Sequence, residues 1–237
     1  DVERGTVRAY DARTGKYVWG WDPIPRDPSN PVYGQWDAHA AQTTGAANAW
    51  APLSVDPERH LVFVPTGSAS PDFFGGLRPG DNRWANSVVA LDGDTGKLAW
   101  GFQLVHHDLW DYDSAAQPSL VTLQHGGRTI PAVIQPTKTG MLFTFDREWQ
   151  NTRLLAPTFK MQLDSGARVF SGTQLLRVLD NGSDDILMRV PDPDAGSDVY
   201  RVNTATGRKN LESLDKPGDV IQWIADADGK LRGAVTD

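Results

Sequence analysis

An internal repeat constrains the fold of this chain more than any other feature of its 237 residues. Residues 9–19, AYDARTGKYVW, align without a gap on residues 90–100, ALDGDTGKLAW. The shared Asp and Thr-Gly suit a tight turn between antiparallel strands. The shared Trp follows at a fixed distance, where it can dock on a neighbouring unit. Because a strand–turn–strand unit that recurs among other strands is typical of propeller blades, we prefer this interpretation to a chance similarity of two hairpins.

The remaining sequence predicts many short strands and no long helix. Segments rich in β-branched and aromatic residues alternate with Asp, Gly, Pro and Asn, as in all-β sandwiches, barrels and propellers. The repeat favours the propeller, and a weaker copy at 202–211, VNTATGRKNL, keeps the Thr-Gly but lacks the Trp. The predicted strands are 5–11, 17–22, 51–56, 61–67, 87–92, 98–104, 130–137, 141–147, 185–191, 198–204, 219–226 and 231–235.

Composition excludes several classes of partner and site. The net charge of −7 argues against nucleic acid or an anionic membrane as a partner. The chain has no cysteine, so disulfides and thiolate metal sites are excluded. No apolar run approaches the ~20 residues that span a bilayer. The chain opens at Asp1 without a Met or a signal sequence, and we expect a processed product or an excised segment.

Residues 104–120, LVHHDLWDYDSAAQPSL, gather histidines, aspartates and aromatic side chains where a turn between strands is expected. Taken alone, an Asp in such a loop is more often a turn residue than a catalytic one. The sequence therefore leaves two interpretations open at this point: a working site, or a polar corner held by its own hydrogen bonds.

Several motifs in register resemble one family. The Trp-ending repeat resembles the tryptophan-docking motif of the quinoprotein dehydrogenases, which are eight-bladed propellers that use pyrroloquinoline quinone (PQQ). HHDLWDYD at 106–113 and PTKTGMLFTFDR at 136–147 are similar to the membrane-bound glucose dehydrogenase branch. The resemblance covers about residues 5 to 148. It implies a periplasmic location for the parent family.

The resemblance implies roles for four residues. Asp111 matches the catalytic carboxylate, which also lies beside the metal, and Asp113 matches an extra carboxylate at the metal. Lys138 matches the cation that hydrogen-bonds the quinone oxygens, and Trp50 matches the floor beneath the PQQ rings. At Ser68, the alcohol dehydrogenase branch has an Asn metal ligand. Since Ca²⁺ takes about six to eight oxygen ligands, these residues supply only part of its shell.

The second half of the chain gives a different resemblance. From about residue 165 to 237, segments such as DVYRVNTATG and WIADADGKLRGAV are similar to the N-terminal propeller of prolyl-oligopeptidase (S9) peptidases. The G-x-S-x-G elbow of their catalytic domain is absent from the sequence. We therefore expect a chimera, designed or selected, with quinoprotein-like blades at 1–150 and peptidase-like blades at 151–237 merged into one domain. A divergent natural quinoprotein is the alternative.

Strand counting predicts an all-β propeller of about four to five blades. Segments 50–104, 118–155 and 168–214 would each form a blade, whereas 5–22 and 219–237 would each form half of one. Strands from both termini could close the ring, or two copies could pair as a homodimer. We expect the strand-poor segment 23–49 to be mobile or partly helical around residues 37–42.

Three functions follow as hypotheses. The first is an inactive chimera that lacks PQQ and calcium and does not oxidise sugars or alcohols, because its site is incomplete and its negative charge repels anionic PQQ. The second is a fragment of a PQQ-dependent sugar or alcohol dehydrogenase that retains PQQ and calcium binding through Trp50, Asp111 and Lys138. The third is a protein-interaction module that uses an open funnel or a strand edge.

Overall fold

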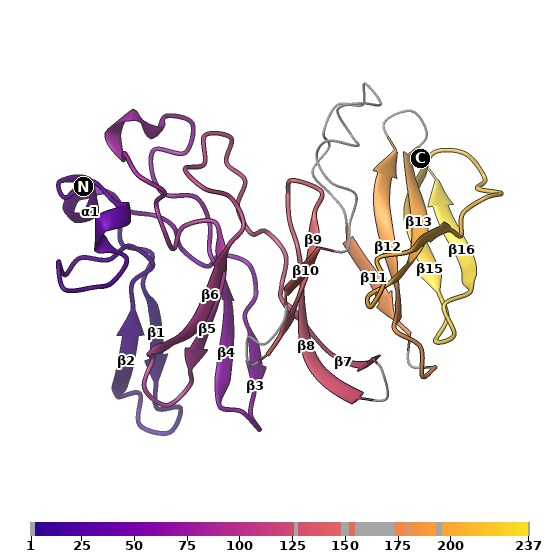
Figure 1. Cartoon of the computed structure of the whole chain (residues 1–237), viewed down its shortest axis with the longest axis horizontal. Helices are drawn as coiled ribbons and strands as arrows, with labels where there is room; N and C mark the ends of the chain where they lie inside the picture. The colour runs from indigo at the N-terminus through magenta and orange to yellow at the C-terminus, as the bar shows by residue number, and fades with distance from the viewer. Residues whose placement is uncertain are drawn as a thin grey trace. The chain divides into compact units, whose positions relative to one another are not determined.

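The computed structural model describes residues 3–125, 128–147, 152–154, 174–179, 181–192 and 196–236. These residues form antiparallel β-sheets with short helical turns (Figure 1). Three sheets have four strands, in the orders β3-β4-β5-β6, β10-β9-β8-β7 and β11-β12-β13-β14, and two sheets have two strands, β1-β2 and β15-β16. The strands are β1 (Val7–Tyr10), β2 (Tyr17–Trp21), β3 (Ser54–Asp56), β4 (Leu61–Pro65), β5 (Ser87–Asp92), β6 (Leu98–Gln103), β7 (Ser119–His125), β8 (Arg128–Pro136), β9 (Leu142–Asp146), β10 (Thr152–Leu154), β11 (Gln174–Val178), β12 (Asp185–Asp192), β13 (Gly196–Asn203), β14 (Lys209–Leu211), β15 (Val220–Ala225) and β16 (Leu231–Thr236).

The sheets confirm the predicted all-β, propeller-type architecture. Each of the twelve predicted strands contains or overlaps an observed one, and the three predicted blades coincide with the three four-stranded sheets. Four strands were not predicted individually: β7, β10, β11 and β14. Two of these, β10 and β14, are only three residues long and lie at sheet edges, so little hydrophobic pattern marks them.

The chain divides into two compact units, residues 1–118 and 119–237. In the first unit the β1-β2 hairpin packs against the β3–β6 sheet through a core of Trp19, Val64, Val89 and Leu91. The domain boundary predicted between residues 150 and 151 was based on the family resemblances. Both residues lie outside the described part of the chain.

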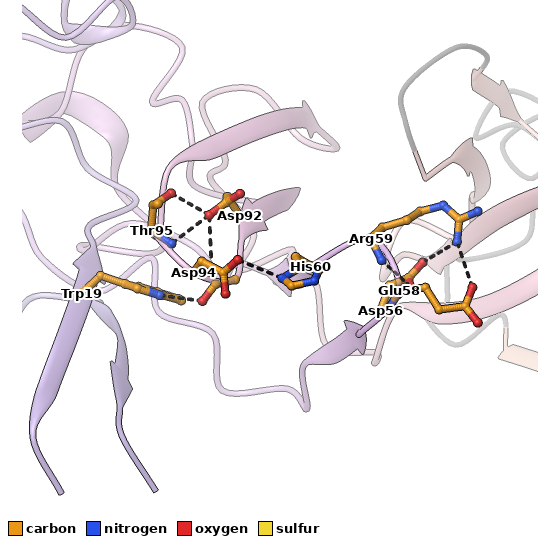
Figure 2. A network of polar contacts seen from close by, with 9 residues as sticks. Trp19, Asp56, Glu58, Arg59, His60, Asp92, Asp94 and Thr95 are labelled. Carbon is orange, nitrogen blue, oxygen red and sulfur yellow. Dashed lines mark hydrogen bonds and ion pairs between the residues drawn. The ribbon is translucent and has the colours of Figure 1, made fainter. Parts of the chain in front are cut away.

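The repeated tryptophans are buried, as predicted. Trp19 and Trp100 are each 8% exposed. The indole N–H of Trp19 donates to the carbonyl of Gly93 at 2.8 Å, at the tip of the β5-β6 hairpin (Figure 2). A Cβ on Gly96 would lie 2.6 Å from the Trp19 ring. The Thr-Gly of one repeat thus provides the flat surface on which the Trp of the other docks.

The turns of the repeat share one hydrogen-bond pattern. Asp92 Oδ1 accepts from the N–H and the hydroxyl of Thr95 at 2.8 and 2.6 Å, and Asp11 does the same with Thr14. In the weaker copy, Asn203 replaces the Asp and holds Thr206 in the same way. The shared Asp or Asn and Thr therefore close the turn, because their side chains satisfy its backbone donors.

The second unit contains two packed interfaces. Side chains of β7, β8 and β9 pack against β12 and β13, with Ile134 and Met188 fully buried at this interface. On the other side of the β11–β14 sheet, Val199 packs against Val220 and Trp223 of β15, and the Trp223 indole donates to the carbonyl of Ser197 at 3.1 Å.

Segment 23–49 lacks strands, as predicted. It contains the short 3-10 helix η1 (Tyr33–Gln35) and the helix α1 (Ala40–Thr43), so the predicted helical character around 37–42 is present. Asp37 Oδ1 accepts the N–H groups of His39 and Ala40 at 3.0 and 2.9 Å, which explains why the helix begins there. Among the described residues, no helix is long and apolar enough to cross a membrane.

Candidate functional site

The loop after β6 is organised around the buried carboxylate of Asp108, which is 1% exposed. Its Oδ2 accepts from the Ser68 hydroxyl at 2.5 Å, from Asn86 Nδ2 at 2.9 Å and from the N–H of Tyr112 at 2.7 Å. Its Oδ1 accepts from the N–H of Trp110 at 3.0 Å. Four donors thus satisfy a carboxylate that would otherwise be costly to bury.

Asp111 lies between the two backbone N–H groups that Asp108 holds. Its φ of +59° is in the left-handed region, which non-glycine residues adopt mainly where surrounding structure enforces it. Its side chain is half-buried. The loop is therefore held by internal hydrogen bonds to Asp108. Asp111 lies between the two residues whose N–H groups donate to that carboxylate.

Asp113 is held against the end of β4. Its Oδ1 accepts the N–H of Ser68 at 2.6 Å, and a Cβ on Gly67 would lie 2.5 Å from the same oxygen. Glycine at 67 is therefore what lets the carboxylate approach the backbone so closely.

Arg78 forms hydrogen bonds within the 71–82 loop and to the loop that contains Asp111. Its guanidinium, 1% exposed, donates to Asn82 Oδ1 at 2.6 Å, to the carbonyl of Pro71 at 3.1 Å and to the carbonyl of Asp108. Burial lowers the pKa of Arg78 from its ordinary value, while the charges of Asp108 and Asp72 act in the opposite direction. This buried cation joins the 71–82 loop to the loop of Asp111.

The predicted site residues fall in both units. Asp111, Asp113, Ser68 and Trp50 belong to the first unit, and Lys138, which is half-buried after β8, belongs to the second. Trp50 is 56% exposed, so its ring is accessible for stacking, as the predicted PQQ floor requires. The structure brings Asp113 to Ser68, and the roles that the resemblance implies for Asp111 and Lys138 stay predictions.

The described residues contain no group of three or more His, Asp or Glu side chains arranged to hold a metal. The Ser68 hydroxyl already donates to Asp108, and Asp113 already accepts from the backbone. Asp111 and Asp113 thus amount to a part of a calcium shell, and the assignment of both to a metal stays a prediction.

Three residues of this network were not predicted: Asp108, Asn86 and Arg78. Each is almost fully buried, and each forms hydrogen bonds that hold a loop. The sequence offered one signal, since a buried loop with many polar residues must satisfy them internally. It could not identify which residues would pair.

The fold and the candidate site together define a propeller-type protein in which Asp111 lies on a loop that a buried polar network holds. Residues 1–150 match the family described as "PQQ: Glucose/ethanol/alcohol dehydrogenase, beta-propeller domain". The chain belongs to this PQQ dehydrogenase family, which confirms the quinoprotein resemblance.

Relatives and solved structures agree with that assignment. The chain is 41% identical over 164 residues to the quinoprotein glucose dehydrogenase of Escherichia coli, covering 69% of this chain and 20% of the relative. It is 44% identical over 149 residues to the quinate/shikimate dehydrogenase (quinone) of Acinetobacter baylyi, covering 62% and 18%. The chain thus spans about a fifth of these relatives. The structure resembles quinohemoprotein alcohol dehydrogenase from Comamonas testosteroni, with a TM-score of 0.63, 21% identity and coverage of 98% of this chain and 42% of that one.

Proposed function

We propose that this chain is part of the catalytic propeller of a PQQ-dependent dehydrogenase that oxidises a sugar or an alcohol. The observation that supports this most strongly is the presentation of Asp111 by the buried Asp108 network, inside the segment that matches the family.

Each residue has a distinct task in this proposal. Asp111 accepts the proton of the substrate hydroxyl as a general base. Trp50 offers the face on which the cofactor rings stack. PQQ, when bound, supplies the hydride acceptor. The incomplete oxygen set around Asp111 and Asp113 supports no step through a metal.

The chimeric and inactive interpretation has less support than this alternative. Nothing in the comparisons shows a prolyl-oligopeptidase segment or a chimera. The fold likeness to the Comamonas testosteroni dehydrogenase extends over 98% of the chain.

The test is dye reduction by the full chain with PQQ and calcium, using D-glucose, ethanol and methanol. We expect PQQ-dependent turnover that falls by at least about 100-fold in Asp111→Ala, the usual contribution of a general base. Asp228→Ala, which removes an exposed carboxylate in the β15-β16 turn, is the matched control and should keep its activity.

A second readout separates binding from chemistry. PQQ should quench tryptophan fluorescence in the parent chain and in Asp111→Ala, but more weakly in Trp50→Ala. Full PQQ binding without any turnover would contradict the proposal for this chain and would favour the inactive interpretation.

A further inference from the structure

Asn86 lies where the ends of three strands meet the loop that contains Asp111. It directly precedes β5, it is 2% exposed, and its φ of +48° is in the left-handed region. Its N–H donates at 2.9 Å to the carbonyl of Gly67, which follows β4, and its carbonyl accepts at 2.8 Å from the N–H of Leu104, which follows β6. The backbone of one residue thus joins the ends of β4, β5 and β6.

The side chain of Asn86 connects these strand ends to Asp108. Its Nδ2 donates to Asp108 Oδ2 and to the Ser68 hydroxyl, at 2.9 Å in each case, and that hydroxyl donates to the same carboxylate oxygen. Because an amide nitrogen carries two N–H donors, Asn86 can bind both partners at once.

The four hydrogen bonds to the Asp108 carboxylate are of two kinds. Those from the N–H groups of Trp110 and Tyr112 lie within the loop and set its shape. Those from Ser68 and Asn86 come from residues 40 and 22 positions away and set the place of the loop relative to the strands. Loss of the Asn86 side chain therefore loosens the placement of the loop and leaves its internal hydrogen bonds intact.

We infer that Asn86 is a positioning residue for the proposed base Asp111 and acts on it through Asp108. A general base must lie within hydrogen-bond reach of the proton that it removes, and a displacement of about 1 Å can lower a rate by about 100-fold. Loss of this link should therefore lower kcat and leave the binding of substrate and PQQ unchanged. The inference rests on the proposed dehydrogenase function and adds a residue to it.

Two substitutions separate the role of the side chain from that of the backbone. Asn86→Gly removes the amide and keeps the left-handed backbone, because glycine adopts a positive φ readily. Asn86→Asp keeps the size of the side chain but replaces the donor by a second carboxylate oxygen close to Asp108, which it repels. His60→Gly is the matched control, since His60 also has a positive φ, +53°, but bonds to Asp94.

Dye reduction by the full chain with PQQ and calcium gives kcat and KM for whichever of D-glucose, ethanol and methanol the parent chain oxidises. We expect kcat to fall by at least about tenfold in Asn86→Gly, and by no less in Asn86→Asp. KM and the fluorescence quenching by PQQ should stay within about threefold of the parent chain. His60→Gly should behave as the parent chain.

A second measurement, ¹H–¹⁵N NMR, reports on the loop without turnover. In Asn86→Gly the amide signals of residues 108–113 should shift. The indole signal of Trp19, whose N–H donates to the carbonyl of Gly93, should stay in place and show that the first unit is folded.

A kcat within about twofold of the parent chain in Asn86→Gly would overturn the inference, as would a raised KM with an unchanged kcat. A displaced Trp19 signal in both Asn86 variants would show a general loss of structure and would also count against a specific positioning role. A parent chain without turnover would contradict the dehydrogenase proposal. The signals of residues 108–113 would then decide alone: shifted signals support the placement of the loop by Asn86, and unchanged signals overturn it.

Discussion

Asp108 and Asp111 are three positions apart in the chain and differ in burial and in hydrogen bonding. Asp108 is buried and accepts hydrogen bonds from four donors, whereas Asp111 is half-buried and held in a left-handed conformation. Both oxygens of Asp108 accept hydrogen bonds that hold the loop, and the proposed proton transfer is assigned to Asp111. The stability of the loop and the reactivity proposed for it therefore belong to different side chains.

Removing the carboxylate of Asp108 should destabilise the first unit. In Asp108→Ala the Ser68 hydroxyl and the two backbone N–H groups of Trp110 and Tyr112 lose their acceptor, and we expect a loss of about 3 kcal/mol in the free energy of unfolding. Urea denaturation checks this value, and hydrogen exchange should show the largest loss of protection at Trp110 and Tyr112. Asp94→Ala, which removes a 71% exposed carboxylate paired with His60, should change stability by less than about 1 kcal/mol. Unchanged exchange at Trp110 and Tyr112 would contradict the anchoring role.

At the scale of the element, the turn that closes each repeated hairpin is the structural unit that recurs. The same Asp–Thr turn closes β1-β2 and β5-β6, and Asn203 closes β13-β14 in the same way. In the first unit the tip also receives the neighbouring Trp19, whose indole bonds to Gly93 (Figure 2). The eleven-residue repeat therefore specifies a turn and a docking contact together.

The turn predicts an acid-sensitive contribution to stability. The hydroxyl of Thr95, and next its N–H, hydrogen-bond Asp92 and hold the pKa of that carboxyl below its ordinary value of 3.8. Because the folded pKa is the lower one, this contribution is present above pH 3.8 and is lost as pH falls through the folded value. In Thr95→Val the pKa of Asp92 should rise toward 3.8, as NMR titration of the side chain would show. An unchanged pKa would mean that the hydroxyl does not set it.

Docking tryptophans should carry much of the stability of the hairpins. Trp100 is 8% exposed and lies 5.9 Å from the ring of Phe63. Trp100→Ala should lower the free energy of unfolding by about 3–5 kcal/mol, as for other large aromatic truncations. Chemical denaturation measures this change, and Trp110→Ala is the exposed control. A loss below about 1 kcal/mol at Trp100 would contradict the docking role.

At the scale of the whole molecule, the two-stranded sheets bear on whether the propeller closes into a ring. Each of β1-β2 and β15-β16 has half the strands of a four-stranded blade, and unpaired strand edges favour association. If these edges do not pair with a second copy, light scattering gives the monomer mass of 26.0 kDa at every concentration. A mass that doubles with concentration would instead support the pairing of two copies.

Much of this protein could be predicted from local sequence. Twelve of the described strands, the repeated turns and the burial of Trp19 follow from short-range patterns, because strand alternation and turn chemistry act over a few residues. Asp111 and Trp50 were chosen as site residues from motifs in register, and their roles stay predictions. The short edge strands β10 and β14 lacked such a pattern, and they form because a neighbouring strand is present to pair with them.

Tertiary structure decided what supports the site. Asp108 meets Ser68 and Asn86, residues 40 and 22 positions away in the chain, and no local pattern specifies such partners. Their pairing follows from burial, since each polar group enclosed by the folded sheets must find a partner among whatever groups the fold brings near. The sequence by itself determined the strands, the turns and the type of chemistry. The folded chain determined that Asp108 became the buried anchor of the loop and that Asp111 stayed half-buried beside it.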